Sequence, residues 1–435
     1  MSDHRPAVVV TGLGAVSPIG VGVAAFVGAL RAGRSGTRLL APDMPGLDRI
    51  RSTAAAPCAE FDPATVMDDA DQRRLPRLVP LALAACQEAM QHARLTVGSE
   101  DAGPRPLTIG LILGTGAGGI DFTLDQAIAG YTPGSTRQPS LWTITNATHG
   151  NLAGELSIRL GLLGPSLCTS TGCASSSDAI GLSMEMLRSG RPGAPDIMIA
   201  VGADAHIRWE TILGMELLRV ISTRDCGGDP AAAASASRPF DRGRDGFVLG
   251  EGAWAVVLER EDVARRREAA PIARARGYGA TCDAYHRVRP APDMRQCALA
   301  MTHALDDAGL PPKAVDVVHY HGTATQLNDA METRAVKLAL GDHVASVRGH
   351  SVKGAIGHPQ GACGAAAAVA TIGSMLGLDG GEGFLPPTIN LHEPDPECDL
   401  DYTPNMPVPR GDARVAMVNC LAFGAKNSAL VFEVL

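Results

Sequence analysis

Lysine and aromatic residues are scarce in this chain of 435 residues. Only four of its 38 basic residues are lysine, and aromatic residues make up 4%. With 46 acidic residues the net charge is −8, which argues against a surface built to bind nucleic acid or an anionic membrane. Charged residues account for 19% and hydrophobic residues for 45%, which excludes a disordered chain and a coiled coil. The four lysines are Lys313, Lys337, Lys353 and Lys426.

The sequence also lacks the marks of a secreted or membrane protein. Its ten cysteines contain no Cys-x-x-Cys pair and no regular spacing, so a disulfide framework is not expected. The apolar run at residues 7–10 is too short for the core of a signal peptide. The uncharged stretch at residues 354–378 is long enough to span a membrane, but about half of it is Gly and Ala. We therefore expect a cytoplasmic protein in which this stretch forms a loop and a buried helix.

Short apolar runs alternate with amphipathic stretches along the chain, which is typical of an α/β fold. The segments 226–237 and 260–268 are expected to be surface segments or linkers. The expected strands are Val8–Thr11, Thr108–Leu113, Ile197–Val201, Ala253–Leu258, Val315–Tyr320, Val415–Asn419 and Leu430–Val434. The expected helices are Leu81–Ala93, Ser175–Ser189, Met294–Ala308, Asp329–Leu340 and Gly364–Leu376.

One local pattern occurs twice. The predicted strand at residues 108–113 leads into Gly114-Thr115-Gly116, and the one at residues 315–320 leads, after His321, into Gly322-Thr323-Ala324-Thr325. Downstream of each, a turn of small residues leads into a helix. We interpret this as two related halves, residues 1–265 and 266–435, although a chance repeat would produce the same short pattern.

Two patterns suggest cofactor or metal chemistry, and both are incomplete. Residues 114–119 have the glycine spacing of a dinucleotide-binding loop, but no Asp or Glu stands in residues 136–150, where the ribose would be held. His319 and His321 would share one face of a strand, with Asp329 and Glu332 as further metal ligands, but no complete ligand set follows. We therefore expect tight-turn packing in the glycine loop, with neither a metal nor a bound cofactor.

Cys173 lies in the small-residue segment 170–178, where a helix is expected to begin. Backbone N–H groups and the helix dipole would point at its sulfur, which favours the thiolate and a lowered pKa. A Cys packed at a crowded helix start is the alternative. His321 and His358 lie in glycine-flanked loops, with Lys353 between them. Such loops after parallel strands meet at one sheet edge, so a Cys-His-His site is plausible.

On these motifs the sequence resembles, nearly end to end, the β-ketoacyl-acyl-carrier-protein synthases of the thiolase-like superfamily. The resemblance implies a duplicated, five-layered α-β-α-β-α fold with two mixed-sheet halves. Residues 1–265 would carry the nucleophilic Cys, and residues 266–435 the two catalytic His. The matching segments are Val8–Gly14 with Ser17 and Pro18, Thr171–Cys173, Arg238–Gly252, His321–Glu332, Lys353–Ala362 and Asn419–Asn427.

The same resemblance implies an acyltransferase that carries out a decarboxylative Claisen condensation. Cys173 would take an acyl chain from the 4′-phosphopantetheine of an acyl carrier protein. His321 and His358 would stabilise the enolate formed from malonyl-carrier protein as CO₂ leaves. Condensation would then give a 3-ketoacyl-carrier protein, in polyketide or fatty-acid chain elongation.

Further roles are carried over from the family. Lys353, near Glu332, would hold charge around His321, and Thr323 and Thr325 belong to the same supporting set. Phe423 would act as a gate, and its N–H would share the oxyanion hole with that of Cys173. Arg73 and Arg74 would help to dock the acidic carrier protein, although Asp68, Asp69 and Asp71 dilute this basic patch.

Several alternatives stay open. Cys168–Cys173 and Gln326–Asp329 look more like the ketosynthase subunits of type II polyketide synthases, which pair with a chain-length-factor partner, than like fatty-acid enzymes. A homodimer or such a heterodimer is therefore expected. A CoA-dependent thiolase using Cys420, or an inactive partner or scaffold subunit, is the competing interpretation. Leu421 and Ala425 stand where the family has Phe and Gly, which leaves the motion of the gate open.

Overall fold

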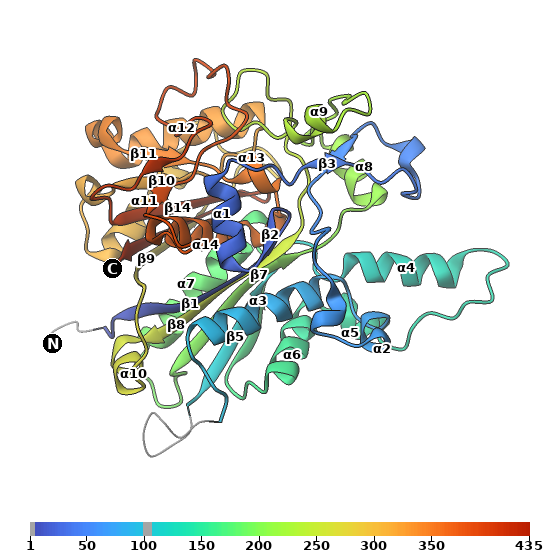
Figure 1. Ribbon diagram of the computed structural model, residues 1–435, viewed down its shortest axis with the longest axis horizontal. Helices are drawn as coiled ribbons and strands as arrows, with labels where there is room; N and C mark the ends of the chain where they lie inside the picture. The colour runs from blue at the N-terminus through green and yellow to red at the C-terminus, as the bar shows by residue number, and fades with distance from the viewer. Residues whose placement is uncertain (1–4, 99–106) are drawn as a thin grey trace.

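Eleven strands form one mixed sheet in the computed structural model, which describes residues 5–98 and 107–435 (Figure 1). The order along the sheet is β11-β10-β14-β15-β9-β1-β8-β7-β5-β6, and β2 pairs with β1. Two short antiparallel pairs lie outside this sheet. They are β3 (Arg38–Leu39) with β4 (Ala54–Ala55) and β12 (Phe384–Leu385) with β13 (Val408–Pro409). The strands of the large sheet are β1 (Val8–Ser17), β2 (Gly20–Val21), β5 (Ile109–Gly114), β6 (Ser166–Thr169), β7 (Ile197–Asp204), β8 (Gly252–Arg260), β9 (Ala273–Cys282), β10 (Val317–His319), β11 (Arg348–His350), β14 (Val415–Ala422) and β15 (Lys426–Val434).

The sheet contains the same strand arrangement twice. In the first half β5 pairs in parallel with β6 and β7, and β7, β8 and β1 then pair antiparallel. In the second half β10 pairs in parallel with β11 and β14, and β14, β15 and β9 then pair antiparallel. The pairing of β1 with β9 joins the two sets. Because the parallel strands of each half end on corresponding edges, the loops after β5, β6 and β10 can meet.

Helices divide the molecule into five layers. Helices α7 (Ser175–Arg188) and α14 (Cys363–Leu376) pack on each other between the two sheet halves, inside the largest apolar core. Helix α3 (Leu78–His92) covers the outer face of the first half, and α11 (Arg295–Ala308) that of the second. The remaining helices are α1 (Val23–Arg31), α2 (Asp69–Gln72), α4 (Ile120–Tyr131), α5 (Thr143–Ala147), α6 (His149–Leu160), α8 (Trp209–Leu217), α9 (Pro230–Ala234), α10 (Glu261–Arg266), α12 (Gln326–Leu340) and α13 (Lys353–Ile356).

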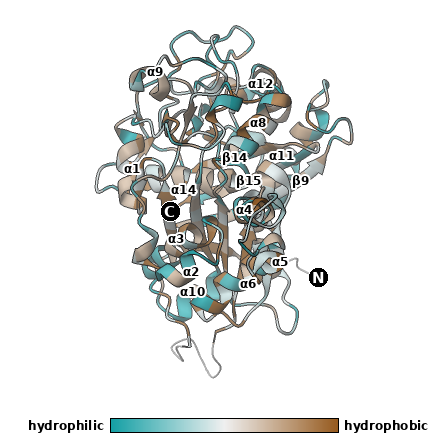
Figure 2. Cartoon of the chain, turned by 90° about the vertical axis from the view of Figure 1, so that its right-hand side faces the viewer, coloured by the Kyte–Doolittle hydropathy of each residue, from teal (hydrophilic) through white to brown (hydrophobic). Residues whose placement is uncertain are grey.

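The sequence patterns explain these layers. Every residue of β1 and β7 is buried, since both faces of these strands are covered by helices. Helix α14 is apolar all round and is buried along nearly its whole length, as a helix between two sheets must be. Figure 2 shows the more hydrophobic residues gathered in the central elements and the more hydrophilic ones on outer helices such as α10 and α12.

Most predicted elements are confirmed, with shifted ends. The predicted strand at residues 315–320 is shorter, because β10 ends at His319. The segments 226–237 and 260–268, expected as surface or linker, contain the short helices α9 and α10. Strand β9 was not predicted, because Arg and Gly alternate with Ala along it. Within the described residues no helix is long and apolar enough to cross a membrane. The stretch at 354–378 contains the expected loop and buried helix, α14, and most of the short helix α13, which was not predicted.

Candidate active site

Cys173 lies in a tight turn between β6 and α7. Gly172 before it has a φ of 66°, a left-handed conformation that glycine adopts without strain. A Cβ on Gly172 would lie 3.4 Å from the carbonyl oxygen of Phe423, so the turn between β14 and β15, here called the C-terminal turn, packs directly against the turn that carries Cys173. Only 4% of Cys173 is exposed. The turn therefore fixes the direction of the thiol.

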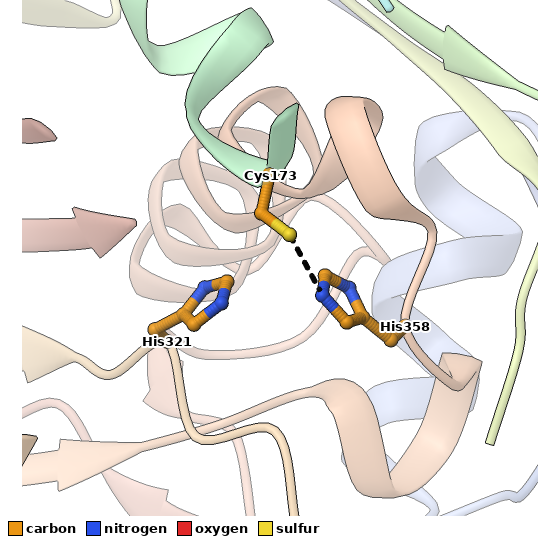
Figure 3. A group of neighbouring side chains, drawn as sticks. All are labelled: Cys173, His321 and His358. Atoms are coloured by element: carbon orange, nitrogen blue, oxygen red, sulfur yellow. Dashed lines mark hydrogen bonds between the residues drawn. The ribbon is translucent and has the colours of Figure 1, made fainter. Parts of the chain in front are cut away.

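Both predicted histidines lie beside this thiol, although they come from the other half of the chain (Figure 3). His321 follows β10, and His358 follows α13. The Nε2 atom of His358 is 3.2 Å from the Sγ of Cys173. The two imidazole rings are 5.3 Å apart at 84°, and one donor atom from each of the three residues lies within 4.8 Å of the others. The structure thus assembles the Cys-His-His set that the sequence indicated.

The protonation state of the thiol differs from the expectation. Burial raises the pKa of Cys173 to about 12, and the opposing influences of Lys353 and of the Phe423 N–H do not offset it. The prediction of a lowered pKa was therefore wrong for the resting site, because loss of hydration outweighs the favourable helix start. The thiol needs a base, and His358 Nε2 is within hydrogen-bond distance.

Burial and the nearby charge of Lys353 lower the pKa of His321 and of His358 well below the usual value. Both rings are consequently neutral at physiological pH. The ring of Phe247 packs edge-on against His358, with centroids 5.1 Å apart. A neutral imidazole can accept a proton at one nitrogen and later donate it from the same atom, which suits both histidines to act on a developing negative charge.

Lys353 and Glu332 act on the backbone of His321. The Lys353 ammonium donates to the His321 carbonyl oxygen. The Glu332 carboxylate accepts the N–H groups of His321 and Gly322 at 2.7 and 2.9 Å. Burial raises the pKa of Glu332 to about 7. These contacts fix the strand-to-loop transition that carries the imidazole.

A cavity of about 420 Å³ opens onto the thiol and both histidines. Thr323 and Thr325 line it, and their hydroxyl groups lie 3.0 Å apart. Phe423 lines it as well, and its backbone N–H points at the Cys173 sulfur. A thioester on a flexible arm could therefore reach the thiol between these residues.

Arg73 and Arg74 lie elsewhere. They follow α2, and Arg74 forms a long ion pair with Asp71 at 3.9 Å. Arg74 lines a different hollow, beside Trp142 and Arg159, and neither arginine lines the cavity at Cys173. The arginines on the cavity at Cys173 are Arg219 and Arg289, both exposed, which the sequence did not single out.

The suggested zinc arrangement on a strand does not form. Because β10 ends at His319, the two imidazoles do not share a strand face: His319 contacts Thr371 at 3.0 Å and packs against His350, while His321 faces the thiol. Soft metal-ligand atoms do gather around His321, since Cys363 and Cys420 lie within 4.8 Å of it. The Cys363 thiol donates to the carbonyl oxygen of Cys173 at 3.0 Å, so it packs against the backbone of that residue.

Two further residues of the site had no signal in the sequence. The Oε1 atom of Gln360 lies 4.0 Å from the Cys173 sulfur, in a Pro-Gln-Gly turn where only the histidine had attracted attention. Asp204, at the end of β7, accepts the N–H groups of Gly116 and Gly361 at 2.8 and 2.7 Å. Nothing in a local sequence window links Asp204 to the loops it holds.

A cysteine between two histidines, placed where the halves of a duplicated α/β sheet meet, defines a condensing enzyme of the thiolase-like class. Comparison with known proteins agrees. The N-terminal domain of β-ketoacyl synthases matches residues 5–264, and their C-terminal domain matches residues 272–392. The chain belongs to the β-ketoacyl synthase family, a family of acyltransferases.

Individual relatives are similar over their whole length. The 3-oxoacyl-[acyl-carrier-protein] synthase 2 of Synechocystis is 38% identical, over 99% of this chain and 98% of the relative. The type II polyketide ketosynthase complex AntDE, solved with the carrier protein AntF, has a TM-score of 0.86 at 28% identity, covering 99% of this chain and 100% of that one. The ishigamide ketosynthase/chain length factor has a TM-score of 0.85 at 31% identity, with the same coverage. These solved ketosynthases share the thiolase-like fold.

Proposed function

We propose that the protein joins a Cys173-bound acyl chain to malonyl-carrier protein by decarboxylative Claisen condensation. The observation that carries this proposal is the buried Cys173 thiol 3.2 Å from His358, with His321 beside it, on a cavity wide enough for a thioester arm. Carrier-bound substrates are supported by similarity to synthases named for acyl-carrier-protein thioesters and to a solved ketosynthase–carrier complex.

In the first step Cys173 takes the acyl group. His358 Nε2 accepts the thiol proton as the sulfur attacks the thioester carbonyl. The backbone N–H groups of Cys173 and Phe423 stabilise the oxyanion. The carrier's thiolate leaves and takes the proton from His358, so the imidazole is neutral again.

In the second step malonyl-carrier protein occupies the same cavity. His321 and His358, the latter now as the tautomer with its proton on Nε2, donate hydrogen bonds to its thioester carbonyl, while the bond to the terminal carboxylate breaks and CO₂ leaves. The electron pair of that bond forms an enolate, whose carbon attacks the acyl carbonyl on Cys173. The cysteine thiolate is expelled and takes a proton from water, which balances the negative charge left by the lost carboxylate, and 3-ketoacyl-carrier protein is released. Lys353 and Glu332 serve as positioning residues for His321.

The test is intact-mass spectrometry with an acyl-carrier protein and with cerulenin. One adduct per chain on Cys173, absent in Cys173→Ala, is expected, followed by loss of the acyl adduct when malonyl-carrier protein is added. Folded protein that forms no adduct would refute the nucleophile. Transfer from acyl-CoA with no response to carrier protein would favour the thiolase alternative, in which Cys420 takes part. The scaffold alternative predicts no adduct at all.

We also propose that a homologous subunit covers one face of the molecule. Helices α4, α5 and α6 contact one another in sequence, α6 contacts the edge strand β6, and α4 with the following loop projects from the body (Figure 1). The exposed apolar side chains on these elements and the loops between them are Ile128, Tyr131, Leu141, Ile144, Ile158, Leu163 and Leu167. A surface with this many exposed apolar side chains is typical of an interface.

We favour a chain-length-factor-type subunit in a polyketide pathway as the partner. The sequence around Cys173 and at Gln326–Asp329 supports this choice, and so does similarity to a solved ketosynthase/chain length factor. Activity that appears only when such a partner is co-expressed supports this assignment. Robust elongation by the purified chain alone supports a homodimer in fatty-acid synthesis. A cytoplasmic location goes with either, because the nucleophile must stay reduced.

Two further assignments belong to this proposal. The duplicated strand order supports division into halves at residues 1–265 and 266–435, with the boundary inside α10. Carrier docking is tested by charge reversal: Arg219→Glu with Arg289→Glu is compared with Arg73→Glu with Arg74→Glu. The pair that raises KM for carrier-bound donors, with no change for small thioesters, forms the docking site.

A further inference from the structure

Two buried cysteines, Cys363 and Cys420, lie next to His321 and take no part in the proposed reaction. Cys363 is the first residue of α14, and Cys420 lies in β14, so both stand on central elements of the fold. Both are buried free thiols. Their sulfur atoms are 3.8 Å apart, and the Cys363 sulfur is 4.0 Å from Nδ1 of His321. Two sulfurs and one imidazole nitrogen, from three separate segments, are therefore gathered in one place.

The spacing of these atoms is close to that of a zinc site. Tetrahedral Zn²⁺ has bonds of about 2.3 Å to sulfur and about 2.0 Å to nitrogen, which hold two sulfurs about 3.8 Å apart and a sulfur and a nitrogen about 3.5 Å apart. The two thiols already have this separation, and the atoms of all three residues lie within 4.8 Å of one another. A shift of the imidazole by about 0.5–1 Å completes a three-ligand set and leaves the fourth position to water.

The charge of this cluster suits a divalent cation. Each thiol gives its proton to solvent as it binds, so two thiolates balance the two charges of Zn²⁺ while the imidazole stays neutral. A neutral complex can lie buried near the Lys353 ammonium, whose charge acts on both Cys420 and His321. Cys173, His321 and His358 also lie within 4.8 Å of one another, but they supply a single thiolate. Their zinc complex would keep a buried positive charge, so the pair of thiols is the better site.

The cavity at Cys173 gives an ion a route to this cluster. His321 lines the cavity, and so do Leu421 and Ala422, the residues that follow Cys420. We propose that Cys363, Cys420 and His321 form a binding site for a thiophilic divalent cation such as Zn²⁺. A bound ion draws the imidazole towards the two thiols and takes its hydrogen bond from the substrate carbonyl, so zinc inhibits decarboxylation. The inhibition rests on the proposed function, whereas the binding site does not.

The test is metal binding by the reduced full-length protein without substrate, with Co²⁺ and Zn²⁺ as probes. Co²⁺ bound to thiolates has charge-transfer absorption in the near ultraviolet, and its intensity grows with the number of thiolates. We expect one Co²⁺ per chain, with the absorption of two thiolates, and its displacement by one equivalent of Zn²⁺. Cys363→Ala and Cys420→Ala should each weaken binding at least ~100-fold, because even the loss of an outer-shell partner of a metal ligand costs about 10–100-fold.

Cys173→Ala and Cys86→Ala are the controls. The first removes the catalytic thiol, and the second removes a fully buried cysteine of α3 in the core of the first half. Both should bind the metal as the wild type does. Binding that is lost in Cys173→Ala, absorption from one thiolate only, or no bound Co²⁺ would overturn the site and leave the proposed condensation intact. If the variants fail to fold, the number of thiolates in the wild-type spectrum decides.

Inhibition is measured as CO₂ release from malonyl-carrier protein. Saturating Zn²⁺ should slow the wild type by about 10²-fold, the effect of losing one donor to the developing oxyanion, and EDTA should restore the rate. Bound zinc with an unchanged rate would overturn the inhibition. A protein that binds two-thiolate Co²⁺ but releases no CO₂ in the absence of zinc would refute the proposed function and support the metal site.

Discussion

The carboxylate of Asp204 accepts the backbone N–H of Gly361 at 2.7 Å and so joins the two halves of the molecule at the active site. The same oxygen accepts the N–H of Gly116 at 2.8 Å. A Cβ on Gly361 would lie only 2.2 Å from the Gly116 nitrogen, so these glycines allow the two loops to touch. One buried carboxylate therefore holds the loop after β5 against the loop that carries His358.

Removing this carboxylate should misplace the second histidine loop. Asp204→Ala leaves the N–H groups of Gly116, Ala117 and Gly361 without their acceptor. Each hydrogen bond to a charged group contributes about 1.5–3 kcal/mol, so we expect a loss of about 3 kcal/mol or more in the free energy of unfolding. Malonyl decarboxylation should fall by about 10²-fold at a temperature where the variant is still folded.

A control separates stability from positioning. Asp316 also accepts two backbone N–H groups, from Arg414 and Val415, but it stands directly before β10, at the end of that strand opposite to His321. Asp316→Ala should lose stability and keep its decarboxylation rate while folded. Equal loss of rate in both variants, measured by CO₂ release, would mean that Asp204 has no special role.

The raised pKa of Cys173 predicts a distinctive pH dependence of alkylation. With a pKa of about 12, the reactive thiolate fraction increases about tenfold for each pH unit below that value. Modification of Cys173 by iodoacetamide, followed by peptide mass, should therefore accelerate from pH 7 to pH 10 without levelling off. A plateau near pH 7–8 would contradict the raised pKa, because it would show that the helix start outweighs burial.

Substitution of the two histidines should have different effects on acylation and on decarboxylation. His358→Ala should slow acylation of Cys173, because the base 3.2 Å from the thiol is removed. His321→Ala should leave acylation nearly unchanged. Both variants should slow malonyl decarboxylation by about 10²-fold or more, because each removes a donor to the developing enolate. Acylation by thioester probes and CO₂ release measure the two steps. Equal effects on acylation would contradict the assignment of His358 as the base.

Local sequence patterns predict some features of the site, and others depend on contacts between distant parts of the chain. The proximity of Cys173, His321 and His358 could be predicted because each stands in a short loop of small residues, which follows a strand for Cys173 and His321 and follows α13 for His358. The strand order is repeated in both halves, as the two similar loop patterns suggested. Gln360 could not be predicted, since its importance comes from its distance to a sulfur 187 residues away. The thiol's protonation state was missed because burial depends on every layer that closes around it.

Ala425 holds the turn next to Phe423 in a strained backbone conformation. Ala425 has a φ of 63°, and an L-residue in this region costs about 1–2 kcal/mol. Ala425→Gly removes the strain but makes the unfolded chain more flexible. We therefore expect a net gain of about 0.5–1 kcal/mol in the free energy of unfolding, measured by thermal unfolding. The turn should also move more freely, which would change the rate of Cys173 acylation.

Glu268 provides the control for this last prediction. It has a φ of 57°, is exposed and lies in the turn after α10. Glu268→Gly should give a similar gain in stability with no change in acylation. If Ala425→Gly gains stability and acylates at the wild-type rate, the strain at residue 425 is only a structural cost. If the control variant and Ala425→Gly are both acylated faster than the wild type, the effect is global, and the turn at Phe423 does not control access to the thiol.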